Sequence, residues 1–243
     1  MPSTIIHNGR HIAYQRQEGQ NPGLIFLGGY ASDMTGTKAS FLAERCAAAN
    51  RAFVRFDYSG HGQSEGRFAD GCIGDWYGDA LAVFDQCTTG QQIVIGSSMG
   101  GWLALKLACD RPQRVKAIIG IAAAPDFTED LVWNQLTPEA QEKMRREGSL
   151  AGQGDDPLTY SYKLVTEGRQ HLLLRAPLPI TCPVHLLQGQ QDNAVPWQTA
   201  GRIRDRLPQA QVTVQLIPAG DHRLSEPDNL ALLWQSVLQL AGS

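Results

Sequence analysis

The feature that most constrains the fold of this chain is the stretch from Ile93 to Gly101. There an apolar, β-branched run meets Gly-Ser-Ser-Met-Gly and then a helical pattern. This G-x-S-x-G sequence at a strand-to-helix junction predicts a sharp turn that exposes Ser98. Gly96 and Gly100 flank the turn because side chains there would collide with the backbones of the neighbouring strand and helix. A serine hydroxyl is weak near neutral pH, so Ser98 is a candidate nucleophile that needs a base.

Short apolar runs alternate with helical patterns along most of the chain. The predicted strands span residues 23–27, 52–56, 92–95, 115–122, 184–188 and 212–217. The predicted helices span residues 37–49, 75–87, 99–110, 196–207 and 227–240. The central strands are apolar enough to be covered on both faces, so the alternation predicts an α/β fold with a mostly parallel, doubly wound sheet.

The N-terminus departs from this alternation. Asn8-Gly9 lies between short apolar runs at 5–6 and 11–15, and Asn-Gly favours the type I′ turn of a tight hairpin. We therefore expect an antiparallel hairpin ahead of the parallel strands.

A second departure is the stretch of residues 125–180, in which no strand is predicted. Thr137 as N-cap and Pro138 in the first turn predict one helix, followed by a loop at 152–157 and a second helical stretch near 160–175. A connection this long favours a functional insertion. We interpret it as a small helical cap at the carboxyl edge of the sheet, the alternative being that these helices only add packing.

Composition excludes several classes of function. We expect residues 1–243 to form a single α/β domain with the cap inserted, since a chain of 243 residues can bury a sizeable core. It is 42% hydrophobic and 19% charged with a net charge of −3, which is typical of soluble globular proteins and gives no sign of a nucleic-acid partner. No apolar stretch approaches the roughly 20 residues that span a bilayer, and the start lacks a signal-peptide pattern. We therefore expect no membrane span and a cytoplasmic location.

The cysteines are odd in number and contain no C-x-x-C pair, which predicts neither a disulfide framework nor a zinc site. We expect reduced, mostly buried thiols. They are Cys46, Cys72, Cys87, Cys109 and Cys182.

A serine nucleophile needs a base, and the base needs an orienting carboxylate. His222 follows the last predicted strand, and Asp192 follows the strand before it. Both therefore lie at the carboxyl edge of the sheet, where the functional loops of open α/β sheets gather. The chain order Ser98, Asp192, His222 is the order expected for a catalytic triad on such a sheet.

Other residues compete for these roles. Asp57 also ends a strand and is the next candidate acid, whereas Asp221 adjoins His222 and neighbouring loop side chains usually diverge. Ser97 occupies the first x of the motif and should point away. His61 lies between two glycines, and turn geometry explains it more simply than catalysis does. The remaining histidines lie where a structural or merely exposed role is expected: His7, His11, His171 and His185.

An acyl-transfer site also needs hydrogen-bond donors for the oxyanion. We expect one to be the backbone N–H of Met99, at the start of the helix after the nucleophile. The second should come from the glycine-containing loop 28–32 after the first parallel strand, and we assign it to Tyr30. A plain glycine turn is the alternative interpretation of this loop.

With these residues the chain resembles the α/β-hydrolase superfamily over nearly its whole length. A closer resemblance, to the small α/β-hydrolases described as palmitoyl-protein thioesterases and acyl-glucuronide esterases, is carried by four segments. They are Gly29-Tyr30 with Ser32 to Met34 and Gly36 to Ala39, then Arg55 to Gly60, Gly96 to Trp102, and Val195-Pro196-Trp197. This resemblance implies the triad, both oxyanion donors and a small cap. The mammalian member is mitochondrial, but this chain has no Arg- and Ser-rich presequence, so we expect a bacterial or mature-length relative.

We expect a serine hydrolase that cleaves acyl thioesters or esters, an S-acylated protein among its potential partners, without a metal or organic cofactor. A small-molecule carboxylesterase or acyl-glucuronide esterase is the alternative. A non-catalytic interaction protein on a hydrolase scaffold and a perhydrolase also stay open, and the sequence carries no signal of oligomeric state.

Substrate-binding candidates are less constrained than the triad. We expect contacts from Gly29 and, in the cap, from Trp133 and Leu136, although cap helices must bury one face in any case. Several cationic side chains of the cap are candidates to meet a substrate carboxylate, and a solvated face is their commoner role. They are Arg145, Arg146, Lys163, Arg169 and Arg175.

Overall fold

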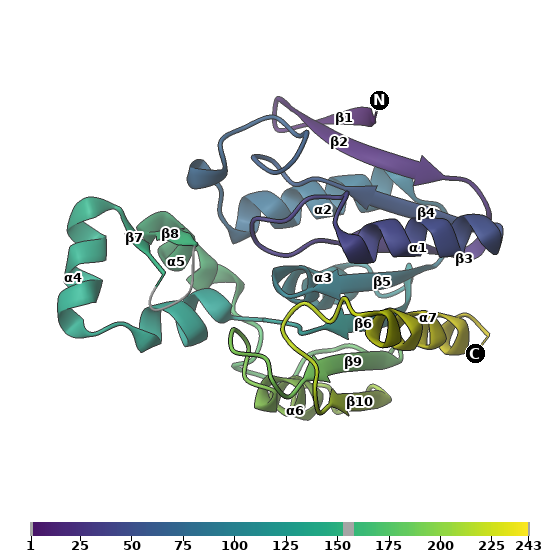
Figure 1. The fold of residues 1–243 in the computed structure, drawn as a ribbon. Coiled ribbons are helices and arrows are strands. Elements are labelled where there is room, and N and C mark those ends of the chain that lie inside the picture. The colour runs from purple at the N-terminus through teal and green to yellow at the C-terminus, as the bar shows by residue number, and fades with distance from the viewer. Residues whose placement is uncertain (1, 153–157, 243) are drawn as a thin grey trace.

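The computed structural model describes residues 2–152 and 158–242, which form an eight-stranded sheet with helices on both faces (Figure 1). The strand order is β1-β2-β4-β3-β5-β6-β9-β10. The strands of this sheet are β1 Ser3–His7, β2 Arg10–Gln17, β3 Gln20–Leu27, β4 Arg51–Phe56, β5 Gln92–Ser97, β6 Val115–Ile121, β9 Val184–Gly189 and β10 Val212–Ile217.

The pairing confirms the predicted α/β-hydrolase fold, with antiparallel strands at the N-terminus and a parallel remainder. β1 pairs with β2 and β2 with β4 antiparallel, whereas the pairs from β4 to β10 are parallel. Asn8 and Gly9 have φ of 48° and 74°, as a type I′ turn requires at both central positions. The predicted Asn-Gly hairpin is therefore confirmed.

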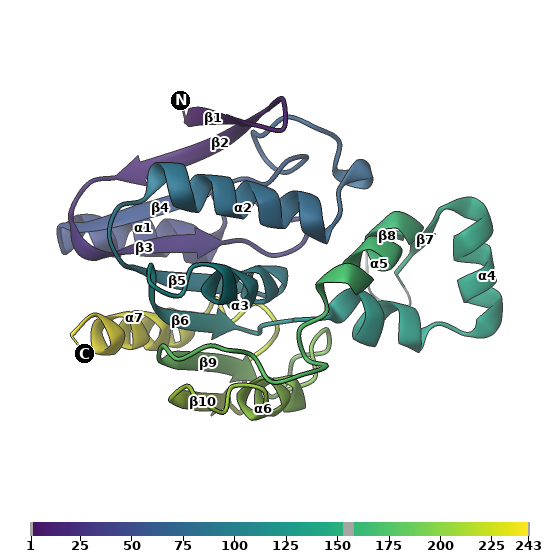
Figure 2. The same ribbon diagram turned by 180° about the vertical axis from the view of Figure 1, so that it is seen from behind.

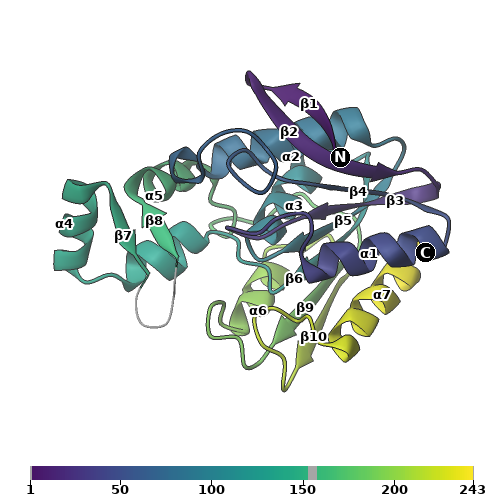
Figure 3. The ribbon, with the colours of Figure 1, turned by 45° about the horizontal axis from the view of Figure 1, so that its top comes forward.

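Helices cover the two faces of the sheet in two groups. The predicted helices are present as α1 Thr37–Ala48, α2 Ile73–Cys87, α3 Met99–Asp110, α6 Gln198–Asp205 and α7 Pro227–Ala241. Buried residues of α2, α3 and α6 pack in one core with the cap, and Figure 2 shows α2 and α3 in front of the sheet. Buried residues of α1 and α7 pack in a second core on the opposite face, where Figure 3 shows these two helices side by side.

The cap lies beyond the carboxyl end of β6, to one side of the sheet (Figure 1). Its helix α4, Pro138–Glu147, begins as predicted, because the Thr137 side chain accepts a hydrogen bond from the backbone N–H of Ala140. It ends at Gly148, whose φ of 80° is the left-handed conformation that glycine adopts freely.

The cap differs from the sequence predictions in three ways. Two short strands, β7 Ser149–Ala151 and β8 Thr159–Ser161, pair antiparallel where no strand was predicted. Three residues are too short for a period-two pattern to register. The second predicted helix is shorter, with α5 at Tyr162–Gly168, a 3₁₀ turn at Arg169–His171 and extended backbone at Leu172. A π-helical turn at Thr128–Val132 was also missed.

Most of the predicted loop at 152–157 lies outside the described residues, which include only Gly152 of that loop. In the part of the chain that the structure describes, no helix is long and apolar enough to cross a membrane.

The cysteines are all unpaired, as expected, and three of them, Cys46, Cys72 and Cys87, are buried. Burial raises the pKa of the Cys46 and Cys72 thiols to about 12 and that of Cys182 to about 11. It also raises the pKa of Cys87 and Cys109 above the usual range. These thiols therefore stay protonated near neutral pH.

Candidate active site

Ser98 occupies the junction between β5 and α3 that the sequence predicted. It is the N-cap residue of α3 with φ 53° and ψ −118°, a backbone conformation that few non-glycine residues adopt. The backbone N–H of Ser98 donates to the Ile121 carbonyl at 2.9 Å, and the Ser98 carbonyl accepts from the N–H of Ala124 at 3.0 Å. Backbone hydrogen bonds to the last residue of β6 and to the chain just after it thus fix the strained turn.

The glycines on either side of this turn have the role that the sequence predicted. A Cβ built on Gly96 would lie 2.2 Å from the carbonyl oxygen of Gly100, and one on Gly100 would lie 2.1 Å from that of Leu27. Both contacts are with backbone, which cannot move aside as a flexible side chain can. The turn that exposes Ser98 therefore requires glycine at both positions.

His222 and Asp192 meet through a hydrogen bond between two loops at the carboxyl edge of the sheet. The Nδ1 atom of His222 lies 2.9 Å from Oδ2 of Asp192. The other carboxylate oxygen accepts the backbone N–H groups of Ala194 and Val195 at 2.9 and 2.8 Å. Because an ionised carboxylate only accepts, Nδ1 carries the proton and Nε2 is left as the basic nitrogen.

The Asp192 side chain is fully buried, yet it stays ionised. Burial raises its pKa, but the hydrogen bond and charge of His222 and the two backbone N–H groups lower it more, so the pKa lies below the usual value. The Gln188 side-chain amide donates a further hydrogen bond at 3.0 Å to the oxygen that faces His222. Asp192 is therefore held in one position by four donors.

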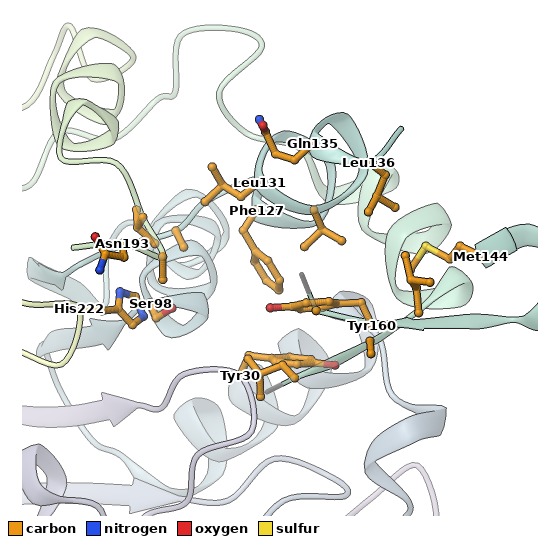
Figure 4. Close-up of a pocket in the computed structure, with 18 of the residues that line it drawn as sticks. Tyr30, Ser98, Phe127, Leu131, Gln135, Leu136, Met144, Tyr160, Asn193 and His222 are labelled. Atoms are coloured by element: carbon orange, nitrogen blue, oxygen red, sulfur yellow. The ribbon is translucent and has the colours of Figure 1, made fainter. Parts of the chain in front are cut away.

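Ser98 and His222 line the same cavity, which has a volume of about 790 Å³. Figure 4 shows both side chains at one end of it, with Asn193 beside them and the cap residues Leu136 and Met144 at the other end. Tyr30, Phe127 and Tyr160 lie between the two ends (Figure 4). The cavity therefore connects a polar end on the sheet to an apolar end in the cap.

The competing acids have other partners. Asp57 accepts the backbone N–H groups of Met34 and Gln63 at 2.6 and 2.8 Å. Asp221 accepts the N–H of Leu224 at 2.8 Å within its own turn. Each of these carboxylates stabilises a loop, and Asp192 is the candidate acid that contacts His222.

The two expected oxyanion donors belong to segments close to Ser98. Met99 is the first residue of α3, where backbone N–H groups have no partner within the helix. Tyr30 lies in the loop after β3 and lines the cavity. Gly29, the residue before it, approaches the nucleophile closely, since a Cβ there would lie 3.4 Å from the Cβ of Ser98.

His61 supports this loop rather than the triad. Its Nε2 accepts the backbone N–H of Ala31 at 3.3 Å, while its Nδ1 donates to the Ser59 carbonyl at 3.2 Å. Burial lowers the pKa of His61, and the Ser59 carbonyl opposes this shift only in part. A neutral His61 therefore holds the residue next to Tyr30.

The cap candidates divide into one that lines the cavity and one that does not. Leu136 lines it, together with Leu131 and Val132. Trp133 is absent from the lining, and its ring packs between the guanidinium groups of Arg145 and Arg169, each 5.0 Å from the ring centroid. Trp133 therefore belongs to the interior of the cap.

The cap cations proposed to meet a substrate carboxylate are engaged elsewhere. Among the described residues they pair with acidic groups of the protein, and none lines the cavity. The pairs are Arg145 with Glu142, Arg146 with Glu147, Lys163 with Asp75, Arg169 with Glu129, and Arg175 with Asp130. The arginine that does line the cavity is Arg223, next to His222 in the sequence.

Several cavity residues were missed by the sequence analysis. Phe127 follows the carboxyl end of β6 and Asn193 directly follows Asp192, so their position after strand ends was the available signal. Met144 and Tyr160 come from α4 and β8. Nothing in the sequence pattern indicated which face of these elements would turn to the cavity.

The chain is similar to several known proteins. The family described as serine aminopeptidase, S33, matches residues 22–154. The Rattus norvegicus protein named palmitoyl-protein thioesterase ABHD10, mitochondrial, is 42% identical over 226 residues, which is 91% of this chain and 76% of the rat protein.

Two solved structures are similar over almost the entire chain. Alpha/beta hydrolase domain-containing protein 10 from mouse is 38% identical with a TM-score of 0.94, covering 99% of this chain and 98% of the mouse chain. A putative hydrolase from Agrobacterium vitis S4 is 35% identical with a TM-score of 0.91, covering 99% and 97%.

Proposed function

Because the chain belongs to the α/β-hydrolases, in the family described as serine aminopeptidase S33, we propose that it hydrolyses acyl thioesters or esters through Ser98, His222 and Asp192. The observation that carries the proposal is a single cavity that joins Ser98 and an Asp192-bound His222 to an apolar end in the cap. Such a cavity supports chemistry at one end and binding of an apolar chain at the other.

The proposed reaction is acyl transfer to water in two steps. Nε2 of His222 takes the proton from Ser98 as its Oγ attacks the acyl carbon, and Asp192 stabilises the imidazolium that forms. The carbon–sulfur or carbon–oxygen bond then breaks, His222 gives its proton to the leaving thiol or alcohol, and an acyl-Ser98 remains. Water, deprotonated by His222, attacks this ester, which releases the acid and restores Ser98.

Two backbone N–H groups are proposed to stabilise the negative oxygen of the tetrahedral intermediates. They belong to Tyr30 and Met99, in segments close to Ser98. Each such donor contributes about 3–4 kcal/mol to transition-state stability in other hydrolases. Support comes from the free helix N-terminus at Met99 and from the position of the Tyr30 loop beside Ser98.

The proposed substrates carry a long acyl chain, as in an S-acylated protein. The apolar end of the cavity supports this choice, because Leu131, Leu136 and Met144 offer aliphatic surface to a chain that starts at Ser98. The related rat protein is named a palmitoyl-protein thioesterase.

Replacing Ser98 tests the chemistry. Ser98→Ala should lower turnover of a nitrophenyl ester by at least about 10³-fold, because the nucleophile is gone. The thermal unfolding midpoint should stay nearly unchanged, since the substitution keeps the backbone hydrogen bonds of the turn. Ser97→Ala is the matched control, because Ser97 is buried beside Ser98 and does not line the cavity.

Substantial turnover in a clean Ser98→Ala preparation would rule out Ser98 as the nucleophile. A fluorophosphonate probe that failed to label the intact protein would favour a non-catalytic interaction protein instead. Labelling of the wild type that is lost in Ser98→Ala would support the proposed nucleophile.

A series of thioesters with acyl chains of two to sixteen carbons tests the substrate class. The proposal expects kcat/KM to rise with chain length as the chain fills the cap end of the cavity. A monotonic fall with length would favour a small-molecule carboxylesterase.

The cellular compartment is a separate question. The rat relative is named mitochondrial, so the comparison gives no support to the cytoplasmic location expected from the sequence.

A further inference from the structure

Tyr30 makes a contact that its proposed role as a backbone donor does not use. Its hydroxyl donates a hydrogen bond of 2.7 Å to the carbonyl oxygen of Thr159, which is 129 positions away in strand β8 of the cap. Its ring stacks on that of Tyr160, with centroids 5.4 Å apart and planes 18° from parallel (Figure 4). The side chain of one proposed oxyanion residue is thus attached to the cap.

The same loop is also held by bonds within itself and by His61, which lies in the loop after β4. The Ser32 backbone N–H and hydroxyl both bind the Gly29 carbonyl, at 3.2 and 2.9 Å, and the Ala31 N–H binds His61. The Tyr30 hydroxyl adds an anchor on the cap side. The position of the Tyr30 N–H therefore depends on its own loop, on His61 and on the cap.

Thr159, which accepts the hydrogen bond of the Tyr30 hydroxyl, lies in β8, and the partner strand β7 carries residues that line the cavity. In the β7–β8 pair, Leu150 is opposite Tyr160 and Ala151 is opposite Thr159. Both Leu150 and Ala151 line the cavity. An acyl chain that packs on β7 therefore contacts the strand whose partner carries the acceptor for the Tyr30 hydroxyl.

We propose that Tyr30 is a positioning residue for long-chain substrates. When an acyl chain occupies the cap end of the cavity, the hydrogen bond from the Tyr30 hydroxyl to Thr159 helps to hold the Tyr30 backbone N–H in place beside Ser98. This inference rests on the proposed function. We expect a short acyl group to make no contact with β7 and to react with the Tyr30 loop in its resting state. A long chain would pack on the β7–β8 pair and strengthen the anchor that this pair gives the Tyr30 loop through Thr159. A ligand can favour one arrangement only through contacts that differ between arrangements, and the long chain has those contacts.

Tyr30→Phe removes the hydroxyl and keeps the ring that stacks on Tyr160. The measurement is the single-turnover rate with acetyl and dodecanoyl thioesters of the same small thiol. We expect the ratio of the dodecanoyl rate to the acetyl rate to fall about fivefold, the effect of one hydrogen bond. The concentration of dodecanoyl thioester at half-maximal rate should change little.

Tyr162→Phe is the matched control, because Tyr162 is a cap tyrosine that packs on Trp133 and does not line the cavity. It should leave the ratio unchanged. Leu150→Ala is a second test variant, in the strand that is proposed to contact the acyl chain. It removes this contact and keeps the pairing of β7 with β8, so it should also lower the ratio.

Equal rate losses for both substrates in Tyr30→Phe, an unchanged ratio, or an effect confined to the half-maximal concentration would each overturn the role of Tyr30. These outcomes leave the proposed function intact. A wild-type protein that does not hydrolyse the dodecanoyl thioester would instead contradict the proposed function itself.

Discussion

The two sides of the proposed reaction centre are built by different means. On one side, Ser98 and Met99 lie between β5 and α3, where backbone hydrogen bonds to Ile121 and Ala124 fix the turn. On the other side, Tyr30 lies in a loop anchored to the rest of the protein through the side chains of His61 and of Tyr30 itself. The nucleophile therefore depends on the sheet, whereas the loop can be tuned by single side chains.

Glycines on the two sides express the same difference. A Cβ on Gly100 would lie 2.1 Å from the backbone oxygen of Leu27, but one on Gly29 would have no neighbour closer than 3.4 Å. The first contact is a collision and the second is close to ordinary van der Waals distance. We expect replacement of the glycine on the nucleophile side to damage the fold, and replacement of the glycine on the loop side to damage the reaction.

The largest expected effect is that of Gly100→Ala. The new methyl group must displace the backbone of either α3 or β3, which should cost about 3 kcal/mol of unfolding free energy and remove most of the activity. Chemical denaturation followed by circular dichroism measures the loss.

Gly201→Ala is the control for this substitution, since a Cβ at Gly201 in α6 meets open space. Its better helix propensity should stabilise the protein by about 0.5–1 kcal/mol. A Gly100→Ala protein as stable as the wild type would contradict the close packing behind Ser98.

Gly29→Ala should have an intermediate effect of a different kind. The methyl group would lie beside the Cβ of Ser98, where it crowds the substrate carbonyl, so kcat/KM should fall about tenfold or more. The unfolding free energy should stay within about 0.5 kcal/mol of the wild type, as for other substitutions without a clash. Loss of stability without loss of activity would reverse the comparison between the two sides.

The smallest expected effect is on the pH dependence of stability. His61, beside the Tyr30 loop, and Asp192, beside His222, contribute to it in different pH ranges. His61 has a lowered pKa in the folded protein, so the unfolded chain binds more protons below its ordinary value of 6.5. The contribution of His61 to the free energy of unfolding is therefore lost as the pH falls below 6.5. Asp192, whose pKa is lowered from 3.8, contributes stability that is lost only as the pH falls below 3.8 through its folded-state value.

His61→Gln tests the contribution of His61, because the glutamine side chain can still accept the Ala31 N–H through its oxygen but does not titrate. Unfolding free energies measured between pH 7 and pH 5 should fall less steeply in this variant than in the wild type. Buried His185, whose pKa burial also lowers, is present in both proteins and cancels from the comparison. Identical slopes would show that His61 does not titrate as the structure indicates.

The sequence predicted the sheet side of the molecule better than the cap side. The strand before Ser98 is a continuous apolar run and the turn needs glycines, so both local patterns agree with the fold. The meeting of Asp192 and His222 could be predicted because each lies in the loop after a strand, and parallel strands end at one edge of the sheet.

The cap was predicted only in outline. Three-residue strands such as β7 and β8 are too short to have a readable period. Trp133 and Leu136 have the same apolar character in the sequence, yet only Leu136 lines the cavity. Which apolar side chain meets the substrate and which meets the cap interior is decided by packing, which a pattern of single residues does not encode.

The buried cysteines have a consequence for a protein proposed to release thiols. Exchange of an acyl group between sulfur atoms requires a thiolate, and burial keeps the pKa of every thiol in this chain above its ordinary value. The chain therefore offers an acyl thioester no competing sulfur acceptor near neutral pH. An acyl mass added to this protein during turnover would then not be a cysteine thioester. Once the acyl group is mapped to Ser98, the intact mass measures the fraction of the enzyme present as acyl-enzyme.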